Sequence, residues 1–263
     1  MCTRLAATLL AALCIGLSGC ASDGEVAPVS YRDSAQQMYE EGLEQLESGD
    51  YMQAIATFEA VRNRFPYASY AALAELRVGD AEFERGQYLA AIDVFKNFLK
   101  LHPSHPEADW AAFRIGESHY RAIPSDFFIF PPPSQRDTTE ARAARTTLED
   151  FLTAYPESKH VPRARELLEE SLRILARHEL YVGDFYASRD KWQGAASRYE
   201  YLLRTYPSVG YDAEATFKLV DALRKLEKPE EALAALQRYL DRHPDGSGVE
   251  RARELMQELR GQP

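Results

Sequence analysis

The six histidines and the paired carboxylates of this chain are the side chains that could bind a metal ion or transfer protons. His102 and His105 have a spacing that suits two ligands of one metal, but each precedes a proline and no cysteine accompanies them. We therefore predict that both lie in a turn. Acidic pairs such as Glu169-Glu170 indicate solvated helix faces. The sequence has no phosphate loop, nucleophile elbow or zinc-protease motif, so we predict no enzyme, no catalytic residue and no metal site.

Cysteine chemistry is confined to the start of the chain, where Cys2, Cys14 and Cys20 lie. An apolar run, residues 5 to 17, follows a basic start; it is too short to span a bilayer and is typical of a signal peptide. The run ends in Leu-Ser-Gly-Cys, which resembles the bacterial lipobox and implies cleavage before Cys20 and acylation of its thiol. An ordinary secretory signal with a chance cysteine is the alternative.

The anchor implied at Cys20 is a diacylglycerol on sulfur and an acyl chain on the new amino terminus, and we expect no other cofactor. Several acyl chains on one residue hold a protein stably at a membrane. Ala21, not aspartate, follows the cysteine. By resemblance to lipoprotein sorting in enteric bacteria, this implies the periplasmic face of the outer membrane. The net charge of −10 argues against nucleic acid as a partner.

A period of 37 residues organises the chain after this anchor, since Gly42, Gly79 and Gly116 are each 37 residues apart. A second pattern precedes five prolines, which are Pro66, Pro103, Pro156, Pro207 and Pro244. In each case alanine stands twelve residues earlier and a large apolar residue eight residues earlier. Glycine and alanine let two helices approach closely, and proline ends the second helix. The pattern resembles the tetratricopeptide repeat.

That resemblance implies an all-α fold, a right-handed solenoid of about five helix pairs. We predict a signal peptide at 1–19, a lipidated tether at 20–33 and the solenoid at 34–263. The repeats are expected at 34–67, 71–104, 107–157, 161–208 and 212–245, with a capping helix at 248–260. We expect a monomer within a hetero-complex, because neither the caps nor a groove requires a second copy.

Repeats three and four exceed the period, because successive prolines are 53 and 51 residues apart there. In repeat three the excess is the stretch PSDFFIFPPPSQRD, residues 124 to 137, whose prolines exclude a helix. In repeat four no helix breaker occurs between Arg163 and Val182, which predicts one helix of about 25 residues, roughly 38 Å long.

Four stretches carry a closer resemblance, and they are NRFPYASY (63–70), LHPSHPEADWAAFRIGESHY (101–120), QRDTTEARAARTTLEDFLTAYPESKH (135–160) and YVGDFYASRDKWQGAASRYEYLLRTYP (181–207). With the lipobox and the loop, they resemble the BamD family of outer-membrane assembly lipoproteins over about residues 33 to 245. Membership implies a non-enzymatic component of the β-barrel assembly machinery. Its expected partners are the C-terminal signals of unfolded outer-membrane β-barrel proteins, the periplasmic domains of a BamA-like barrel protein, and other BAM lipoproteins. The alternative is another periplasmic repeat scaffold, either a CpoB-like cell-division coordinator or a pilotin of a secretin or pilus.

The repeat register predicts that the first helices of repeats one to three line a concave groove for a client peptide. Its predicted lining residues are Tyr39, Leu43, Leu46, Leu76, Asp80, Phe83, Phe113, Glu117 and Tyr120. Burial of the leucines between repeats is the alternative.

The family resemblance singles out two further sets of residues. The loop of the family contains an aromatic pair, which Phe127 and Phe128 match, with Phe130 nearby. It also contains an Arg-Asp before the next helix, which Arg136 and Asp137 match. These residues are expected to contact a partner or the protein's own helices, and Asp137 to cap the next helix. Arg198 falls on an arginine that contacts BamA in relatives, with an ordinary surface salt bridge as the alternative.

Overall fold

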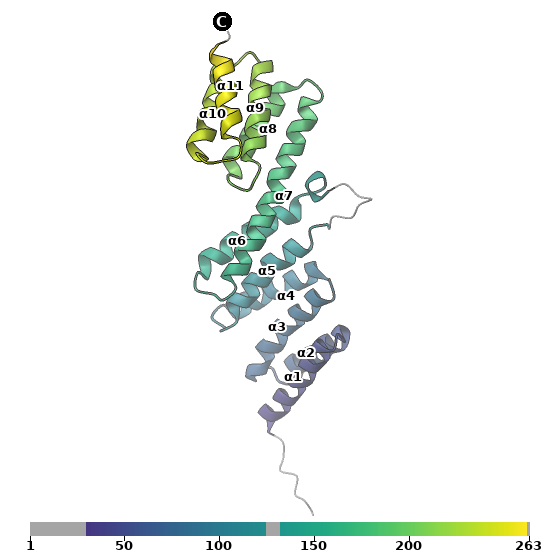
Figure 1. Ribbon diagram of the computed structural model, residues 1–263. Coiled ribbons are helices and arrows are strands. Elements are labelled where there is room, and N and C mark those ends of the chain that lie inside the picture. Colours follow the sequence, from purple (N-terminus) through teal and green to yellow (C-terminus); the bar gives the residue numbers. More distant parts are fainter. Residues whose placement is uncertain (1–29, 125–131, 262–263) are drawn as a thin grey trace, which may run out of the picture.

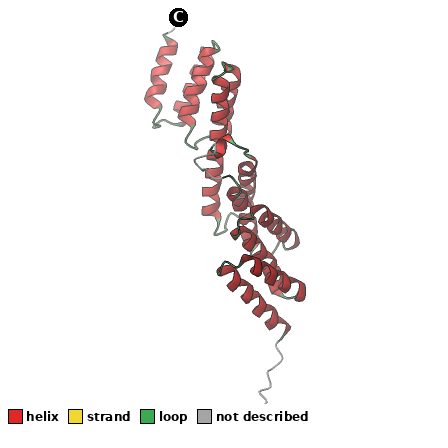
Figure 2. Cartoon of the chain, turned by 90° about the vertical axis from the view of Figure 1, so that its right-hand side faces the viewer, coloured by secondary structure: helices red, strands yellow, loops and turns green. Residues whose placement is uncertain are grey.

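A computed structural model describes residues 30–124 and 132–261, and every regular element in these residues is a helix (Figures 1 and 2). The helices along the chain are α1 (Tyr31–Glu47), α2 (Tyr51–Arg64), α3 (Ser69–Glu84), α4 (Tyr88–Leu101), α5 (Ala108–Arg121), the 3₁₀ helix η1 (Pro133–Gln135), α6 (Thr139–Ala154), α7 (Val161–Ala187), α8 (Trp192–Thr205), α9 (Asp212–Lys225), α10 (Pro229–Arg242) and α11 (Val249–Arg260).

Each helix packs on the next along the chain, so that five helix pairs and the final helix α11 form one elongated stack (Figure 1). The predicted all-α solenoid of five pairs with a capping helix is therefore confirmed. The helices fall within the predicted repeat bounds except that α1 begins at Tyr31 and α3 at Ser69, slightly earlier than expected. The hand of the superhelix stays a prediction.

The repeated glycines lie where the two helices of a pair come closest. A methyl group added at Gly79 would lie 2.5 Å from Cε1 of Phe95, and one added at Gly183 would lie 2.3 Å from Cε1 of Tyr199. Both rings are buried and belong to the second helix of the same pair. A side chain at either glycine would force helices apart in an interior that is packed without spare space.

The long helix predicted for repeat four is confirmed, because α7 runs unbroken for 27 residues with proline in its first turn. Its first part packs on α6 and contacts α5 through Val161, Ala164 and Leu167, while its C-terminal part packs on α8. In Figure 1, α7 joins the lower helix pairs to the upper ones. The stretch before α6 is tied to it, since Nδ1 of His178 lies 2.7 Å from the carbonyl oxygen of Ser134. Phe127, Phe128 and Phe130 lie outside the described residues, as does Cys20.

Candidate functional site

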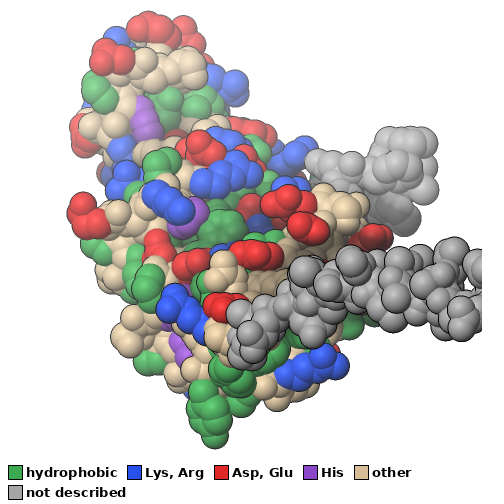
Figure 3. Space-filling model, turned by 90° about the horizontal axis from the view of Figure 1, so that it is seen from below, with side chains coloured by type: hydrophobic (Ala, Val, Ile, Leu, Met, Phe, Trp, Pro, Cys, Tyr) green, Lys and Arg blue, Asp and Glu red, His purple; other side chains and the backbone are tan. Residues whose placement is uncertain are grey.

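The first helices of repeats one to three line an open hollow of about 410 Å³, which we call the N-terminal groove. Its lining residues are Tyr39, Leu43, Leu46, Glu47, Arg77, Asp80, Glu84, Trp110 and Arg114. Leu43 and Leu46 form an apolar wall on α1, and charged side chains from α3 and α5 form the floor. Seen from the N-terminal end of the stack, acidic and basic side chains lie beside apolar ones over this end of the molecule (Figure 3).

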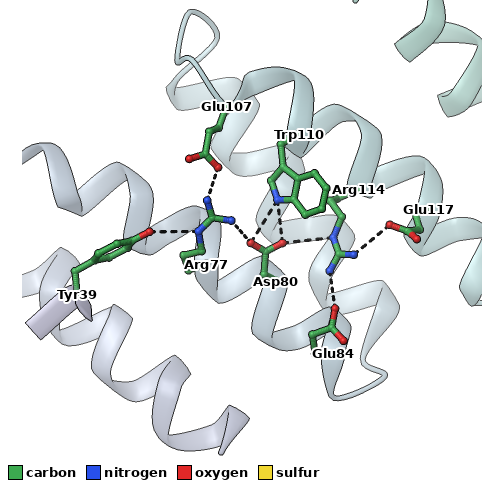
Figure 4. A network of polar contacts seen from close by, with 8 residues as sticks. All are labelled: Tyr39, Arg77, Asp80, Glu84, Glu107, Trp110, Arg114 and Glu117. Carbon is green, nitrogen blue, oxygen red and sulfur yellow. Dashed lines mark hydrogen bonds and ion pairs between the residues drawn. The ribbon is translucent and has the colours of Figure 1, made fainter. Parts of the chain in front are cut away.

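A continuous network of polar contacts crosses the floor from α1 to α5 (Figure 4). The guanidinium group of Arg77 donates to Asp80 on its own helix and to Glu107 just before α5. Its Nε also donates to the hydroxyl of Tyr39 on α1, at 3.3 Å. One arginine thus joins the first three repeats.

Asp80 is the centre of this network. Its Oδ1 accepts from the indole Nε1 of Trp110 at 3.1 Å. The same oxygen lies 3.4 Å from Nε of Arg114, an ion pair without hydrogen-bond geometry. Arg114 donates to Glu117 at 3.1 Å and to Glu84 at 3.3 Å. Two arginines and an indole therefore converge on one carboxylate.

The network is mostly buried, and this shifts the proton affinity of its members. Burial raises the pKa of Asp80, and the guanidinium groups of Arg77 and Arg114 oppose that shift. Burial alone lowers the pKa of Arg77, but the charge of Asp80 and the hydrogen bond to Tyr39 raise it above its usual value. Each charged group of the network has an ion-pair partner, with four carboxylates sharing two arginines, so the floor is a paired and net acidic surface rather than a free acid or base.

Of the nine predicted groove residues, the structure brings Tyr39, Leu43, Leu46 and Asp80 together around the N-terminal groove. Glu117 is buried beside it and bonds to Arg114. Tyr120 is half-buried and lies instead at a second pocket, described below.

The prediction that Leu76, Phe83 and Phe113 line the groove is wrong. Leu76 is fully buried in the core between repeats two and three. Phe83 is covered by Arg114, whose guanidinium carbon lies 3.5 Å from the ring centroid. Phe113 is buried and stacks on His160, with 5.1 Å between ring centroids. Neighbouring repeats cover these positions.

Arg77, Trp110 and Arg114 are the floor residues that sequence reasoning missed. A signal for two of them was present, because Arg77 and Arg114 are separated by the 37-residue period, as are Asp80 and Glu117. An arginine and a carboxylate three residues apart face each other on a helix. Their recurrence in two repeats could have indicated a chain of ion pairs along the inner face.

The remaining predicted residues lie farther along the stack. Nη1 of Arg198 donates to Glu179 of α7 at 3.0 Å, and 44% of the Arg198 side chain stays exposed. Asp137 is exposed and accepts from the backbone amide of Thr139, at the start of α6, at 2.9 Å. The hydrogen bonds from Thr139 hold the pKa of Asp137 below its usual value. Arg136 is half-buried.

Within residues 30–124 and 132–261, no group of three or more histidine, cysteine or acidic side chains is arranged to hold a metal ion. No helix in the same part of the chain is both long and apolar enough to cross a membrane.

The fold and the groove together define an all-helical repeat protein of the tetratricopeptide class. A family model described as an outer membrane lipoprotein, YfiO, matches residues 32–238. The chain therefore belongs to the YfiO family of outer membrane lipoproteins.

Curated relatives support the same assignment and confirm the resemblance to BamD. The chain is 29% identical over 225 residues to the outer membrane protein assembly factor BamD of Haemophilus influenzae, covering 84% of this chain and 83% of that protein. It is 28% identical over 231 residues to the BamD of Neisseria meningitidis serogroup B, covering 84% and 85%. Among solved structures, the TPR2AB domain of yeast Sti1 in its pHSP90 complex aligns with 81% of this chain and 79% of that one, at 15% identity and a TM-score of 0.46. A likeness of that degree carries no argument about function.

Proposed function

We propose that this protein is a non-enzymatic lipoprotein of the β-barrel assembly machinery, held at the periplasmic face of the outer membrane by acyl chains on Cys20. It assists assembly and insertion of β-barrel proteins by binding their C-terminal signals and the periplasmic domains of a BamA-like barrel protein. The observation that carries the proposal is the family match over residues 32–238, which spans α1 to α10 nearly completely. The relatives reported above all bear the name of an assembly factor.

The N-terminal groove suits an extended client with apolar side chains. Each charged group of its floor has an ion-pair partner within the protein, and the excess of carboxylates over arginines disfavours an acidic client. Leu43 and Leu46 are only partly buried and offer apolar surface beside Tyr39. A cross-linking amino acid in place of Leu43 is expected to capture unfolded barrel protein, whereas the same residue in place of exposed Met52 on α2 is expected to capture none. Equal capture of barrel protein at Leu43 and Met52 would show that the client does not bind in the N-terminal groove.

The contact with the barrel subunit is assigned to Arg198, whose half-exposed guanidinium remains accessible beside Glu179. Arg198→Glu is a poor test, because it would place two carboxylates together where Glu179 is only 7% exposed. The paired change Arg198→Gln with Glu179→Gln removes both charges and preserves a hydrogen bond between amides.

The test is a pull-down of the lipidated protein from detergent-solubilised outer membranes, followed by mass spectrometry. The unchanged protein is expected to recover a large barrel protein with repeated periplasmic domains. The double variant is expected to recover less of it while keeping its helical circular dichroism. Arg165→Gln, an exposed arginine on the first half of α7, is the matched control and should leave recovery unchanged. Recovery of secretin or cell-division components instead would overturn the proposed function.

A further inference from the structure

A second pocket of about 430 Å³ lies where α7 passes from the lower helix pairs to the upper ones, and we call it the elbow pocket. The end of α5, the middle of α7 and Tyr211 before α9 form its walls. Ile123 and Ile174 supply apolar surface. Arg121 and Arg177 belong to the same lining. The pocket thus combines an apolar interior with guanidinium groups.

The positive charge at this pocket exceeds the negative charge available to balance it. Glu170 is the acidic side chain of the lining, and it accepts a hydrogen bond from the hydroxyl of Tyr120. Burial and then this hydrogen bond raise the pKa of Tyr120 to about 12, so the hydroxyl keeps its proton. A third lining arginine, Arg173, pairs with Glu169.

Arg121 and Arg177 form no ion pair with any residue in the described part of the chain. Two unpaired guanidinium groups in a chain of net charge −10 favour an anionic ligand. Arginine is well suited to this task, because its planar fork matches the geometry of a carboxylate.

The face of α7 that contributes Arg177 continues beyond the pocket with exposed aromatic rings. Tyr181 and Phe185 follow at intervals of four residues and are 40% and 45% exposed. Four residues of helix rise about 6 Å, and two residues of an extended strand span about 6.7 Å. An extended peptide lying along α7 would therefore bring alternate side chains onto successive members of this row.

We propose that the elbow pocket binds the C-terminal residue of an extended peptide, with its carboxylate paired to Arg121 and Arg177. The apolar side chain of that residue lies between Ile123 and Ile174, and preceding alternate residues contact Tyr181 and Phe185. A volume of about 430 Å³ suits one or two residues rather than a whole strand. The inference rests on the proposed function, because the peptide is taken to be the C-terminal signal of a client. The N-terminal groove, which shares no lining residue with the elbow pocket, is then left to another extended segment of the client.

The row of aromatic rings distinguishes a peptide from an anionic lipid headgroup as the occupant. A headgroup would be held by the arginines alone and would gain nothing from side chains spaced along α7. An extended chain with alternating apolar residues uses both the charge and the spacing.

The test compares two ten-residue peptides of alternating apolar sequence that end in phenylalanine, one with a free carboxylate and one with a carboxamide. Binding to the lipidated full chain in detergent is followed by fluorescence anisotropy. The free acid is expected to bind about tenfold more tightly or better, the difference that a charge-assisted hydrogen bond supplies. Arg177→Gln is expected to reduce this preference, the double change Arg121→Gln with Arg177→Gln to abolish it, and the matched control Arg165→Gln to preserve it.

Equal affinity for the two peptides would overturn the inference, and so would an undiminished preference in Arg177→Gln. If both peptides bind equally but Leu43→Glu weakens them, the proposed client binding holds and the elbow pocket is not its end site. If neither peptide binds, both proposals fail. Loss of binding to anionic phospholipid vesicles in Arg177→Gln, with peptide binding unchanged, would assign the pocket to lipid instead.

Discussion

Removing the central carboxylate of the N-terminal groove tests the network most directly. Asp80→Ala leaves the guanidinium groups of Arg77 and Arg114 without the carboxylate with which both form ion pairs, and only 18% and 7% of these two side chains are exposed. Breaking a buried charge pair by removing one partner costs about 3–5 kcal/mol. Arg77 keeps Glu107 and Arg114 keeps Glu117, so we expect the lower end, about 3 kcal/mol.

The loss comes from the stranded arginines and not from the buried carboxylate itself. Burial raises the pKa of Asp80 above its value in the unfolded chain, so the ionised carboxylate is less favourable in the folded protein than in the unfolded chain. Glu117 is buried and pairs only with Arg114 among the described residues, so it has to be replaced with the other three. Replacing Arg77, Asp80, Arg114 and Glu117 together by apolar residues of similar length is therefore expected to restore most of the stability. A quadruple variant that is no more stable than Asp80→Ala would contradict this account.

The measurement is urea unfolding followed by tryptophan fluorescence. The chain has two tryptophans, and Trp110 donates to Asp80. A Trp192→Phe background makes the signal report on the network alone, which matters because repeats of a solenoid can unfold separately. Glu84→Ala is the control, since Glu84 pairs with the same Arg114 at 3.3 Å but is 49% exposed. We expect at most about 1 kcal/mol for this surface partner. Equal losses in the two variants, or a loss under about 1 kcal/mol in Asp80→Ala, would refute the reasoning.

Two further outcomes follow from the structure, and a third follows from the sequence. Gly183→Ala is expected to lower stability by about 1–3 kcal/mol in thermal unfolding, because the new methyl group would meet the buried ring of Tyr199 at 2.3 Å; a change within about 0.5 kcal/mol would show that the helices can part freely. His160 has a pKa lowered mainly by burial, so the unfolded chain takes up its proton first as the pH falls through 6.5. Stability should therefore fall with pH below that value, and His160→Gln should flatten the profile, whereas an unaltered pH profile would exclude His160 as its source. Cys20→Ala is expected to abolish incorporation of labelled palmitate into the protein, because it removes the thiol that would be acylated. Persistence of the label would argue against acylation at this residue.

Much of the fold could be predicted because, in a repeat protein, short sequence patterns indicate where neighbouring helices pack and where each helix ends. Gly79 and Ala91 mark positions where helices of one pair meet closely, and a proline marks the exit from each second helix. These constraints act within about forty residues, so period and composition suffice to place the helices. The long helix α7 followed in the same way from the absence of a breaker.

The candidate site could be predicted only in part, because exposure of an inner-face residue depends on what the next repeat places over it. Tyr39 and Leu76 occupy equivalent positions 37 residues apart, yet Tyr39 lines the groove and Leu76 is fully buried. The long side chain of Arg114 reaches back from α5 and covers Phe83 on α3. No periodicity within one helix contains that information.

By itself the sequence determined the helical repeats, the extra length in repeats three and four, and the resemblance that the family match then confirmed. Only the tertiary structure decided which side chains remain open to a ligand and which charges are already matched. It showed Arg77 and Arg114 converging on Asp80, and it left Arg121 and Arg177 without an ion pair among the described residues. The physical reason is that helix formation and close packing within a repeat are local. Burial and charge pairing on the inner face arise between repeats, where side-chain length and the placement of neighbouring helices decide the outcome.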